Sequence, residues 1–213
     1  MKKGIIFDLD GTLWDSSQAV VDSWNDILKG EPDVTRLADL DWMQRLMGKT
    51  MKDIEDEFFD YLPEDRRSGL MKRCLDHENE YIAENGGVLF PCLSEVLGKL
   101  HEKYHLSIVS NCQEGYIPAF FKAHGTEAFF DDYEENGRTG LVKADNIRLV
   151  VERNGLEKAV YVGDTLGDYN STMQAGLPFI HAAYGFGKVP EGTAFIRDIR
   201  ELPERVEEIF SLY

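Results

Sequence analysis

The stretch "GIIFDLDGTLWDS", Gly4–Ser16, decides the fold of this chain. It starts with a short apolar run rich in β-branched and aromatic residues, which predicts a buried strand over Gly4–Asp10. The run ends in two aspartates, Asp8 and Asp10, and Gly11 then permits a sharp turn. Residues two apart on a strand point the same way, so the two carboxylates are expected to repel each other. Such an arrangement needs a chemical reason.

The net charge of the chain narrows the choice of partners. The 213 residues include 23 basic and 39 acidic side chains, which give a formal net charge of −16. This charge repels nucleic acid and anionic membranes, so neither is expected as a partner. It would also repel an anionic substrate, unless a cation or local basic residues reverse the sign at the site. The length allows one sizeable core with a small second subdomain.

The apolar runs and the cysteines bear on localisation. No apolar run reaches the roughly 20 residues that a membrane helix needs. The first residues meet acidic side chains too early for a signal peptide. Three scattered cysteines, Cys74, Cys92 and Cys112, fit a reducing compartment better than a disulfide framework. We therefore expect a cytoplasmic protein.

The chain divides into two regions by pattern. Residues 14–87 are charge-rich, and their apolar residues recur at helical spacing until the "ENGG" stretch, Glu84–Gly87. Beyond residue 88, strand patterns such as "HLSIVSN", "EAFFDDY", "AVYVGDT" and "PFIHAAY" alternate with helical patterns of about ten residues. This predicts an α/β fold with a parallel sheet built from residues 1–13 and 88–213, and a helical subdomain over 14–87.

Polar side chains follow the predicted strands. In a parallel sheet, ligands bind beyond the carboxyl ends of the strands, so these residues are the candidates for a site. They supply carboxylates, a hydroxyl and an amine, and in chain order they are Asp8, Asp10, Gly11, Thr12, Ser110, Asn111, Lys143, Asp164 and Asp168.

Taken together, these residues resemble the motifs of the haloacid dehalogenase-like superfamily, whose members are mostly phosphatases. Its D-x-D-G-T motif matches Asp8–Thr12, its second motif matches Ser110, its third Lys143, and its fourth Asp164 with Asp168. The extension "LWDS" is similar to the phosphoglycolate phosphatase-like branch, in which a helical cap is inserted after the first motif. The resemblance implies a Rossmann-like parallel sheet core with an inserted α-helical cap. One departure is that Ala144 and Asp145 follow Lys143, where the family often has prolines.

The chemistry of a phosphate monoester suits these residue types. A dianion resists attack by an anionic nucleophile, and a divalent cation such as Mg²⁺ neutralises charge on both partners. Asp8 and Asp164 are expected to hold the cation, with the Asp10 backbone carbonyl added by resemblance and Asp168 supporting directly or through water. The expected partners of the phosphoryl oxygens are Ser110, Asn111 and Lys143, with backbone N–H groups of the loop that includes Gly11 and Thr12.

The two aspartates need different roles. The resemblance assigns Asp8 as the nucleophile that forms an aspartyl-phosphate, and Asp10 as the general acid and base. Dehalogenation needs no acid for a halide leaving group, so the second aspartate argues against a dehalogenase.

Two further interpretations stay open. The segment "RLMGKT", Arg45–Thr50, resembles the cap loop that contacts the leaving group, where Lys49 or Arg45 would meet an anionic group. It also reads as a helix-ending glycine with exposed basic neighbours. Asp168 equally suits the N-cap of a helix that begins near Leu166.

The expected function is a Mg²⁺-dependent phosphatase of a small phosphorylated metabolite: a phosphoglycolate-like acid, a sugar phosphate or a nucleotide. One alternative is a β-phosphoglucomutase-like phosphotransferase that uses the same aspartates. The other is a non-catalytic protein that binds a phosphometabolite or a partner on the same scaffold. The sequence leaves monomer and homodimer open.

Overall fold

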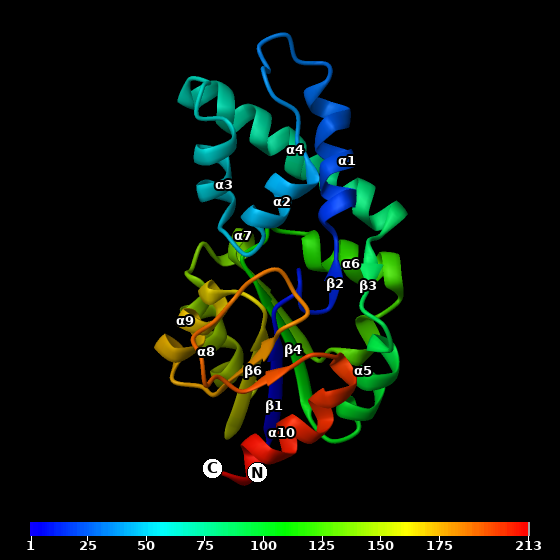
Figure 1. Cartoon of the computed structure of the whole chain (residues 1–213), viewed down its shortest axis with the longest axis vertical. Coiled ribbons are helices and arrows are strands. Elements are labelled where there is room, and N and C mark those ends of the chain that lie inside the picture. The colour runs from blue at the N-terminus through cyan, green and yellow to red at the C-terminus, as the bar shows by residue number, and fades with distance from the viewer. Residues whose placement is uncertain (213) are drawn as a thin grey trace.

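The core of the molecule is a six-stranded parallel sheet. The computed structural model describes residues 1–212, with helices on both faces of the sheet and a group of further helices above its edge (Figure 1). The strand order is β5-β4-β1-β6-β7-β8, and every neighbouring pair is parallel. The strands are β1 Lys3–Phe7, β4 His105–Ser110, β5 Asp132–Glu135, β6 Lys158–Gly163, β7 Phe179–Ala182 and β8 Phe195–Ile196.

The central strand β1 explains the apolar run that opens the chain. It pairs with β4 on one side and β6 on the other, with Phe7 opposite Ile108 and Val162. Ile5 and Phe7 belong to one buried cluster, while Ile6 belongs to the cluster on the opposite face of the sheet. A strand covered on both faces needs apolar residues at consecutive positions, which is the pattern in the sequence.

Helices cover the two faces of the sheet (Figure 1). The face that carries Ile6 is covered by α8 Lys143–Arg153 and α9 Leu166–Ala175. The other face is covered by α5 Leu93–His101, α6 Tyr116–His124 and α10 Leu202–Ser211. Shorter turns are η1 Glu127–Phe129, α7 Asn136–Thr139 and η2 Ile199–Glu201. The predicted α/β class with a parallel sheet is confirmed.

One strand prediction needs correction. The segment "EAFFDDY" was expected to be a single strand, but its first residues form the 3₁₀ turn η1, and β5 begins only at Asp132. Phe129 and Phe130 pack against the core from this turn, so burial of a turn produced the strand-like pattern.

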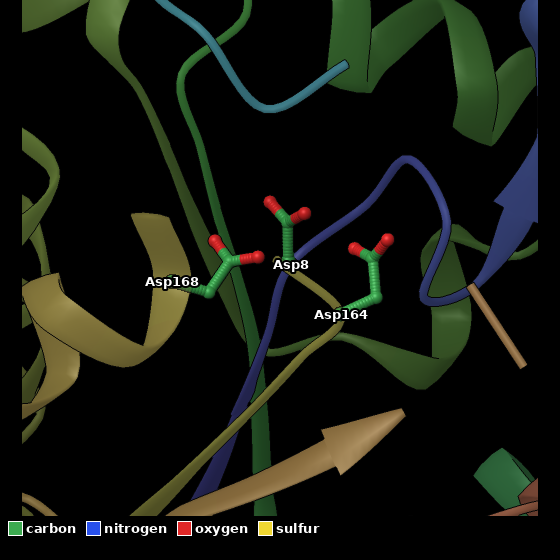
Figure 2. Close-up of side chains that lie close together, drawn as sticks. All are labelled: Asp8, Asp164 and Asp168. Atoms are coloured by element: carbon green, nitrogen blue, oxygen red, sulfur yellow. The ribbon is translucent and has the colours of Figure 1, made fainter. Parts of the chain in front are cut away.

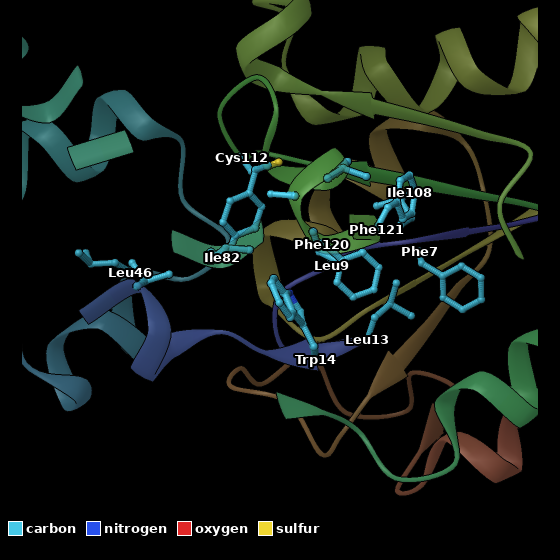
Figure 3. Close-up of a cluster of buried hydrophobic side chains, with 14 of the residues drawn as sticks. Phe7, Leu9, Leu13, Trp14, Leu46, Ile82, Ile108, Cys112, Phe120 and Phe121 are labelled. Carbon is cyan, nitrogen blue, oxygen red and sulfur yellow. The ribbon is translucent and has the colours of Figure 1, made fainter. Parts of the chain in front are cut away.

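The helical insert consists of α1 Ser17–Leu28, α2 Leu40–Leu46, α3 Met51–Phe58 and α4 Glu64–Asn85. It is joined to the core by β2 Trp14–Asp15 and β3 Val88–Leu89, which pair antiparallel as a two-stranded ribbon. A buried apolar cluster continues from the sheet into the insert, where Leu46 and Ile82 lie (Figure 3). The Trp14 ring lies edge-on to Phe120, with ring centres 4.9 Å apart. The insert therefore packs on the core over the ribbon.

Among residues 1–212, no helix combines the length and the apolar character needed to cross a membrane.

Candidate active site

The carboxyl ends of β1, β4 and β6 lie side by side at the edge of the sheet below the insert (Figure 1). Asp8 directly follows β1, and its backbone N–H donates to the Val162 carbonyl of β6 at 2.8 Å. Ser110 ends β4, and Asp164 directly follows β6. The sheet topology thus places side chains more than 150 residues apart in the sequence at one edge.

The turn after β1 requires glycine at position 11. Gly11 has a φ of +80°, a conformation that side-chain-bearing residues rarely adopt. A Cβ atom at this position would lie 2.4 Å from Oδ2 of Asp164, so a larger residue would displace that carboxylate. The turn is closed by the Leu13 N–H, which donates to the Leu9 carbonyl at 2.9 Å. Gly11 therefore allows the loop and the Asp164 carboxylate to share one space.

Three buried carboxylates converge beside one lysine. Oxygen atoms of Asp8, Asp164 and Asp168 all lie within 4.8 Å of one another (Figure 2). The Lys143 ammonium, at the start of α8, donates to Oδ1 of Asp8 at 2.8 Å and to Oδ1 of Asp168 at 2.5 Å. All four side chains are at most 3% exposed. Lys143 is therefore a buried ion-pair partner and not an ordinary surface lysine.

The electrostatics of this cluster leave it short of positive charge. Burial, followed by the charge of Asp168, raises the pKa of Asp8 well above its usual range, although Lys143 acts in the opposite direction. Burial and Asp168 also raise the pKa of Asp164, to about 7. Burial alone would lower the pKa of Lys143, but the charges of Asp168 and Asp8 raise it well above its usual value. Three carboxylates against one ammonium give a net charge that a divalent cation would balance.

The hydrogen bonds show which carboxylate oxygens are open to a cation. Within residues 1–212, the buried Oδ2 of Asp8 has no hydrogen-bond partner. Oδ1 of Asp164 accepts a long 3.4 Å hydrogen bond from the Thr12 hydroxyl, while its Oδ2 accepts the Phe186 N–H at 2.7 Å. An unpartnered carboxylate oxygen in a buried acidic cluster fits a hard cation with oxygen ligands such as Mg²⁺.

Asp168 is both a helix cap and a partner of the lysine. Its Oδ2 accepts from the backbone N–H of Thr165 at 3.0 Å and from the Thr165 hydroxyl at 2.7 Å, which completes a capping box at the start of α9. Its Oδ1 pairs with Lys143. Since both oxygens are engaged, Asp168 holds Lys143 and anchors α9 at once.

Asp10 lies in a different environment from Asp8. Its Oδ1 accepts from the Trp14 indole N–H at 3.0 Å, the Ser16 hydroxyl at 2.5 Å and the Tyr116 hydroxyl at 2.9 Å. Burial raises the pKa of Asp10, and these three donors lower it in part. Asp10 is not a member of the carboxylate cluster beside Lys143, so two aspartates two residues apart face different chemistry.

Sequence reasoning missed the three residues that hold Asp10. Ser16 stands at the N-cap position of α1, but its hydroxyl donates to Asp10 and not to the helix backbone. Trp14 packs against Phe120 and also donates its indole N–H to Asp10. Tyr116 lies 106 residues from Asp10 in the sequence, and no local pattern marks it.

Removing the Tyr116 hydroxyl should change the titration of Asp10. In Tyr116→Phe, we expect the limb of the pH–rate profile that reports Asp10 to shift to higher pH, because a donor that lowers the pKa of Asp10 is lost. Turnover of esters with poor leaving groups should fall roughly tenfold. Tyr104→Phe, far from the site against Phe210, is the matched control. An unshifted profile would show that Tyr116 has only a packing role.

A small cavity of about 40 Å³ lies between the site and the insert. It has room for a few water molecules. Ser110 and Asn111 line it from the core, and the Asn111 amide donates to the Gly48 carbonyl of the insert at 2.9 Å. Asn111 therefore joins the core to the insert loop.

The two basic residues of the insert loop differ in position. Lys49 lines the cavity, and its ammonium pairs with Glu57 at 2.5 Å. Arg45 is exposed and lies instead in a shallow depression against the start of α9. The structure thus places Lys49 beside the site and Arg45 outside its cavity.

The parallel sheet, the helices inserted after its first strand and the carboxylate–lysine cluster at its carboxyl edge define the class: an α/β protein with a buried acidic site built to bind a cation. A family model described as haloacid dehalogenase-like hydrolase matches residues 5–182. The chain belongs to this family, and the resemblance predicted from its motifs is confirmed.

Similar proteins agree with this assignment. A phosphoglycolate phosphatase of Shigella dysenteriae serotype 1 is 28% identical over 216 residues, covering 86% of this chain and 82% of that protein. The structure described as a predicted phosphoglycolate phosphatase from Haemophilus somnus superposes with a TM-score of 0.83 at 22% identity, covering 96% of this chain and 98% of that one. A β-phosphoglucomutase from Clostridium difficile superposes with a TM-score of 0.79 at 13% identity, over 100% and 99%. These structural likenesses show the shared fold.

Proposed function

We propose that the chain is a Mg²⁺-dependent phosphatase that hydrolyses a small phosphorylated metabolite through an aspartyl-phosphate. The observation that carries this proposal is the difference between Asp8, in an acidic cluster beside Lys143, and Asp10, held by three neutral donors. The phosphoglycolate phosphatases among the relatives support the reaction class. The substrate classes are a phosphoglycolate-like acid, a sugar phosphate and a nucleotide.

In the first half of the reaction, Asp8 attacks phosphorus and the bond from phosphorus to the leaving oxygen breaks. Lys143 lowers the pKa of Asp8 against the effects of burial and Asp168, holds it in position through Oδ1, and offers positive charge to the phosphoryl oxygens. Asp10 enters this step protonated and gives its proton to the leaving alkoxide. The raised pKa of Asp10 favours the protonated form that this step needs.

In the second half, water attacks phosphorus of the aspartyl-phosphate. Asp10, now ionised, takes a proton from that water, and the bond between phosphorus and the Asp8 oxygen breaks. Inorganic phosphate leaves, and both aspartates return to their starting states.

Asp8 and Asp164 would hold Mg²⁺, with the backbone carbonyl of Asp10 as a further ligand and Asp168 in support through Lys143. When bound, Mg²⁺ neutralises charge on the nucleophile and on the phosphoryl group. Ser110, and Asn111 beside it, border the space for the phosphoryl oxygens. The backbone N–H groups of Gly11 and Thr12 donate to the Trp14 and Leu9 carbonyls, so they hold the shape of the loop and do not bind the phosphoryl group in this conformation.

We further propose that residues 14–87 act as a cap on a core of residues 1–13 and 88–213. The β2–β3 ribbon would be the hinge, since it carries both connections of the insert. The cavity of about 40 Å³ is too small to admit a phosphate ester from outside, so substrate entry requires the insert to move.

Metal removal tests the cation. We expect EDTA to lower phosphate release from p-nitrophenyl phosphate by at least about 10²-fold and Mg²⁺ to restore it. Added Mg²⁺ should also raise the melting temperature, and Asp164→Asn should abolish that rise. Turnover that persists without metal would contradict the proposal. Isomerisation of a hexose phosphate without phosphate release would instead favour the phosphotransferase alternative.

A further inference from the structure

A buried carboxyl group lies in the cavity on the insert side. Glu78 of α4 is 4% exposed and lines the same cavity as Asp8 and Asp10. Its Oε2 accepts the Trp24 indole N–H at 2.5 Å, and its Oε1 accepts from the Gln113 amide at 3.0 Å. Donors from α1 and from the core thus fix the carboxyl group in place.

The wall around Glu78 is apolar. Its neighbours in the cavity wall include Val20, Trp24, Met43, Leu46, Met51 and Ile54. Among the described residues that line this cavity, Lys49 is the one basic side chain, and Glu57 already engages it. The part of the cavity that faces the insert therefore has a mostly apolar wall, one buried carboxyl group and room for only a few water molecules.

The protonation of Glu78 is tuned by the same surroundings. Burial raises the pKa of Glu78 to about 7, while the hydrogen bonds from Gln113 and Trp24 act to lower it. Above neutral pH the group is largely ionised. Two donors leave further lone pairs on its oxygens, so the carboxylate can accept another hydrogen bond from a bound molecule.

The Glu78 carboxylate and the apolar wall around it would face the leaving group of a bound substrate. With phosphorus next to Asp8, the leaving group occupies the insert side of the cavity. A carboxylate on it would meet Glu78 with little water between, where like charges repel strongly. A hydroxyl or ammonium group would instead donate to Glu78, and a polar group in a dry site discriminates sharply against ligands that leave it unpaired.

We propose that Glu78 is a specificity-determining residue that selects leaving groups carrying a hydrogen-bond donor and rejects those carrying a carboxylate. This inference rests on the proposed phosphatase function. Of the three proposed substrate classes it disfavours the phosphoglycolate-like acid, so 2-phosphoglycolate is expected to be a poor substrate.

Three esters of nearly equal length test the proposal. They are 2-phosphoglycolate, 2-hydroxyethyl phosphate and O-phosphoethanolamine, which place a carboxylate, a hydroxyl and an ammonium group at the same position. At pH 8 with Mg²⁺, we expect kcat/KM for both donor-bearing esters to exceed that for 2-phosphoglycolate by at least about tenfold. This order of kcat/KM values is measured on the parent protein, so a folding defect in a variant cannot affect it.

The variant Glu78→Gln removes the charge and keeps the shape. We expect the ratio of kcat/KM between 2-phosphoglycolate and 2-hydroxyethyl phosphate to rise at least about tenfold, and the preference for the ammonium ester to fall. Glu80→Gln is the matched control, because Glu80 is exposed on the same helix. It changes the net charge equally and should leave the ratio unchanged.

The outcomes separate the two proposals. If p-nitrophenyl phosphate is hydrolysed but 2-phosphoglycolate is preferred over the hydroxyl ester, the inference about Glu78 is overturned and the phosphatase function stands. An unchanged ratio in a folded Glu78→Gln variant overturns it equally. If no phosphate is released from any ester, including p-nitrophenyl phosphate, the proposed function fails and this inference fails with it.

Discussion

Asp8→Asn should abolish turnover and leave the fold intact. An asparagine amide is a poor nucleophile, so kcat/KM should fall by at least about 10³-fold, or roughly 4 kcal/mol of lost transition-state stabilisation. The fold should persist, since the asparagine oxygen can still accept from Lys143. Burial raises the pKa of Asp8, which means that its ionised form is costly in the folded protein. At pH 8 the variant should therefore melt at the same temperature as the parent or higher.

Phosphate release and thermal melting together check this prediction. Asp41→Asn is a matched control, because Asp41 is an exposed aspartate in the first turn of α2. It should keep the parental rate within about twofold. Parental turnover by a folded Asp8→Asn protein would show that the nucleophile has been assigned to the wrong residue.

Lys143→Met should reduce both activity and stability. The ammonium lies between Asp8 and Asp168, and its removal leaves buried carboxylates without a counter-charge. Breaking a buried pair in this way typically costs about 3–5 kcal/mol. The loss should grow with pH, because the pKa of Asp8 is already raised in the folded parent and rises further once Lys143 no longer lowers it, so ionising Asp8 in the folded variant costs more than in the parent. Turnover should fall by at least about 10²-fold, since the group that positions the nucleophile is gone.

Denaturant midpoints at pH 5.5 and pH 8.5 measure this effect. The loss of unfolding free energy should be larger at pH 8.5, and adding Asp168→Asn to Lys143→Met should recover part of it, because one uncompensated charge is removed. Lys122→Met, at an exposed position of α6, is the control and should lose little at either pH. Equal stability of Lys143→Met and the parent at both pH values would refute the role of this ion pair.

The sequence predicted the carboxylates and the lysine because each follows a pattern that has a fixed place in a parallel sheet. Asp8 and Asp164 come directly after short buried strands, and Lys143 begins a helix. Adjacent parallel strands end at the same edge of the sheet. The strand order β4-β1-β6 therefore brings the residues that follow these strands together. Local patterns were sufficient there.

The surroundings of Asp10 and Glu78 could not be predicted in the same way. Tyr116 reaches Asp10 only because α6 packs beneath the ribbon, which depends on the tertiary fold. Glu78 sits in a helix whose texture is polar and charge-rich. The sequence nevertheless contained a signal. Glu78 lies at a spacing of four residues from Cys74 and Ile82, which continue the buried series that starts at Leu70. An acid on that series belongs to the buried face of the helix.

The β2–β3 ribbon has a thermodynamic consequence. Trp14 and Ser16 approach Asp10 from the ribbon side, whereas Tyr116 approaches it from the core. A rotation of the insert about the ribbon would separate these donors from one another. In that case insert closure and protonation of Asp10 would be coupled: the free energy by which closure favours the proton would equal the free energy by which the proton favours closure. A ligand that closes the insert would, by that reciprocity, set the acidity of the group that later protonates its leaving oxygen.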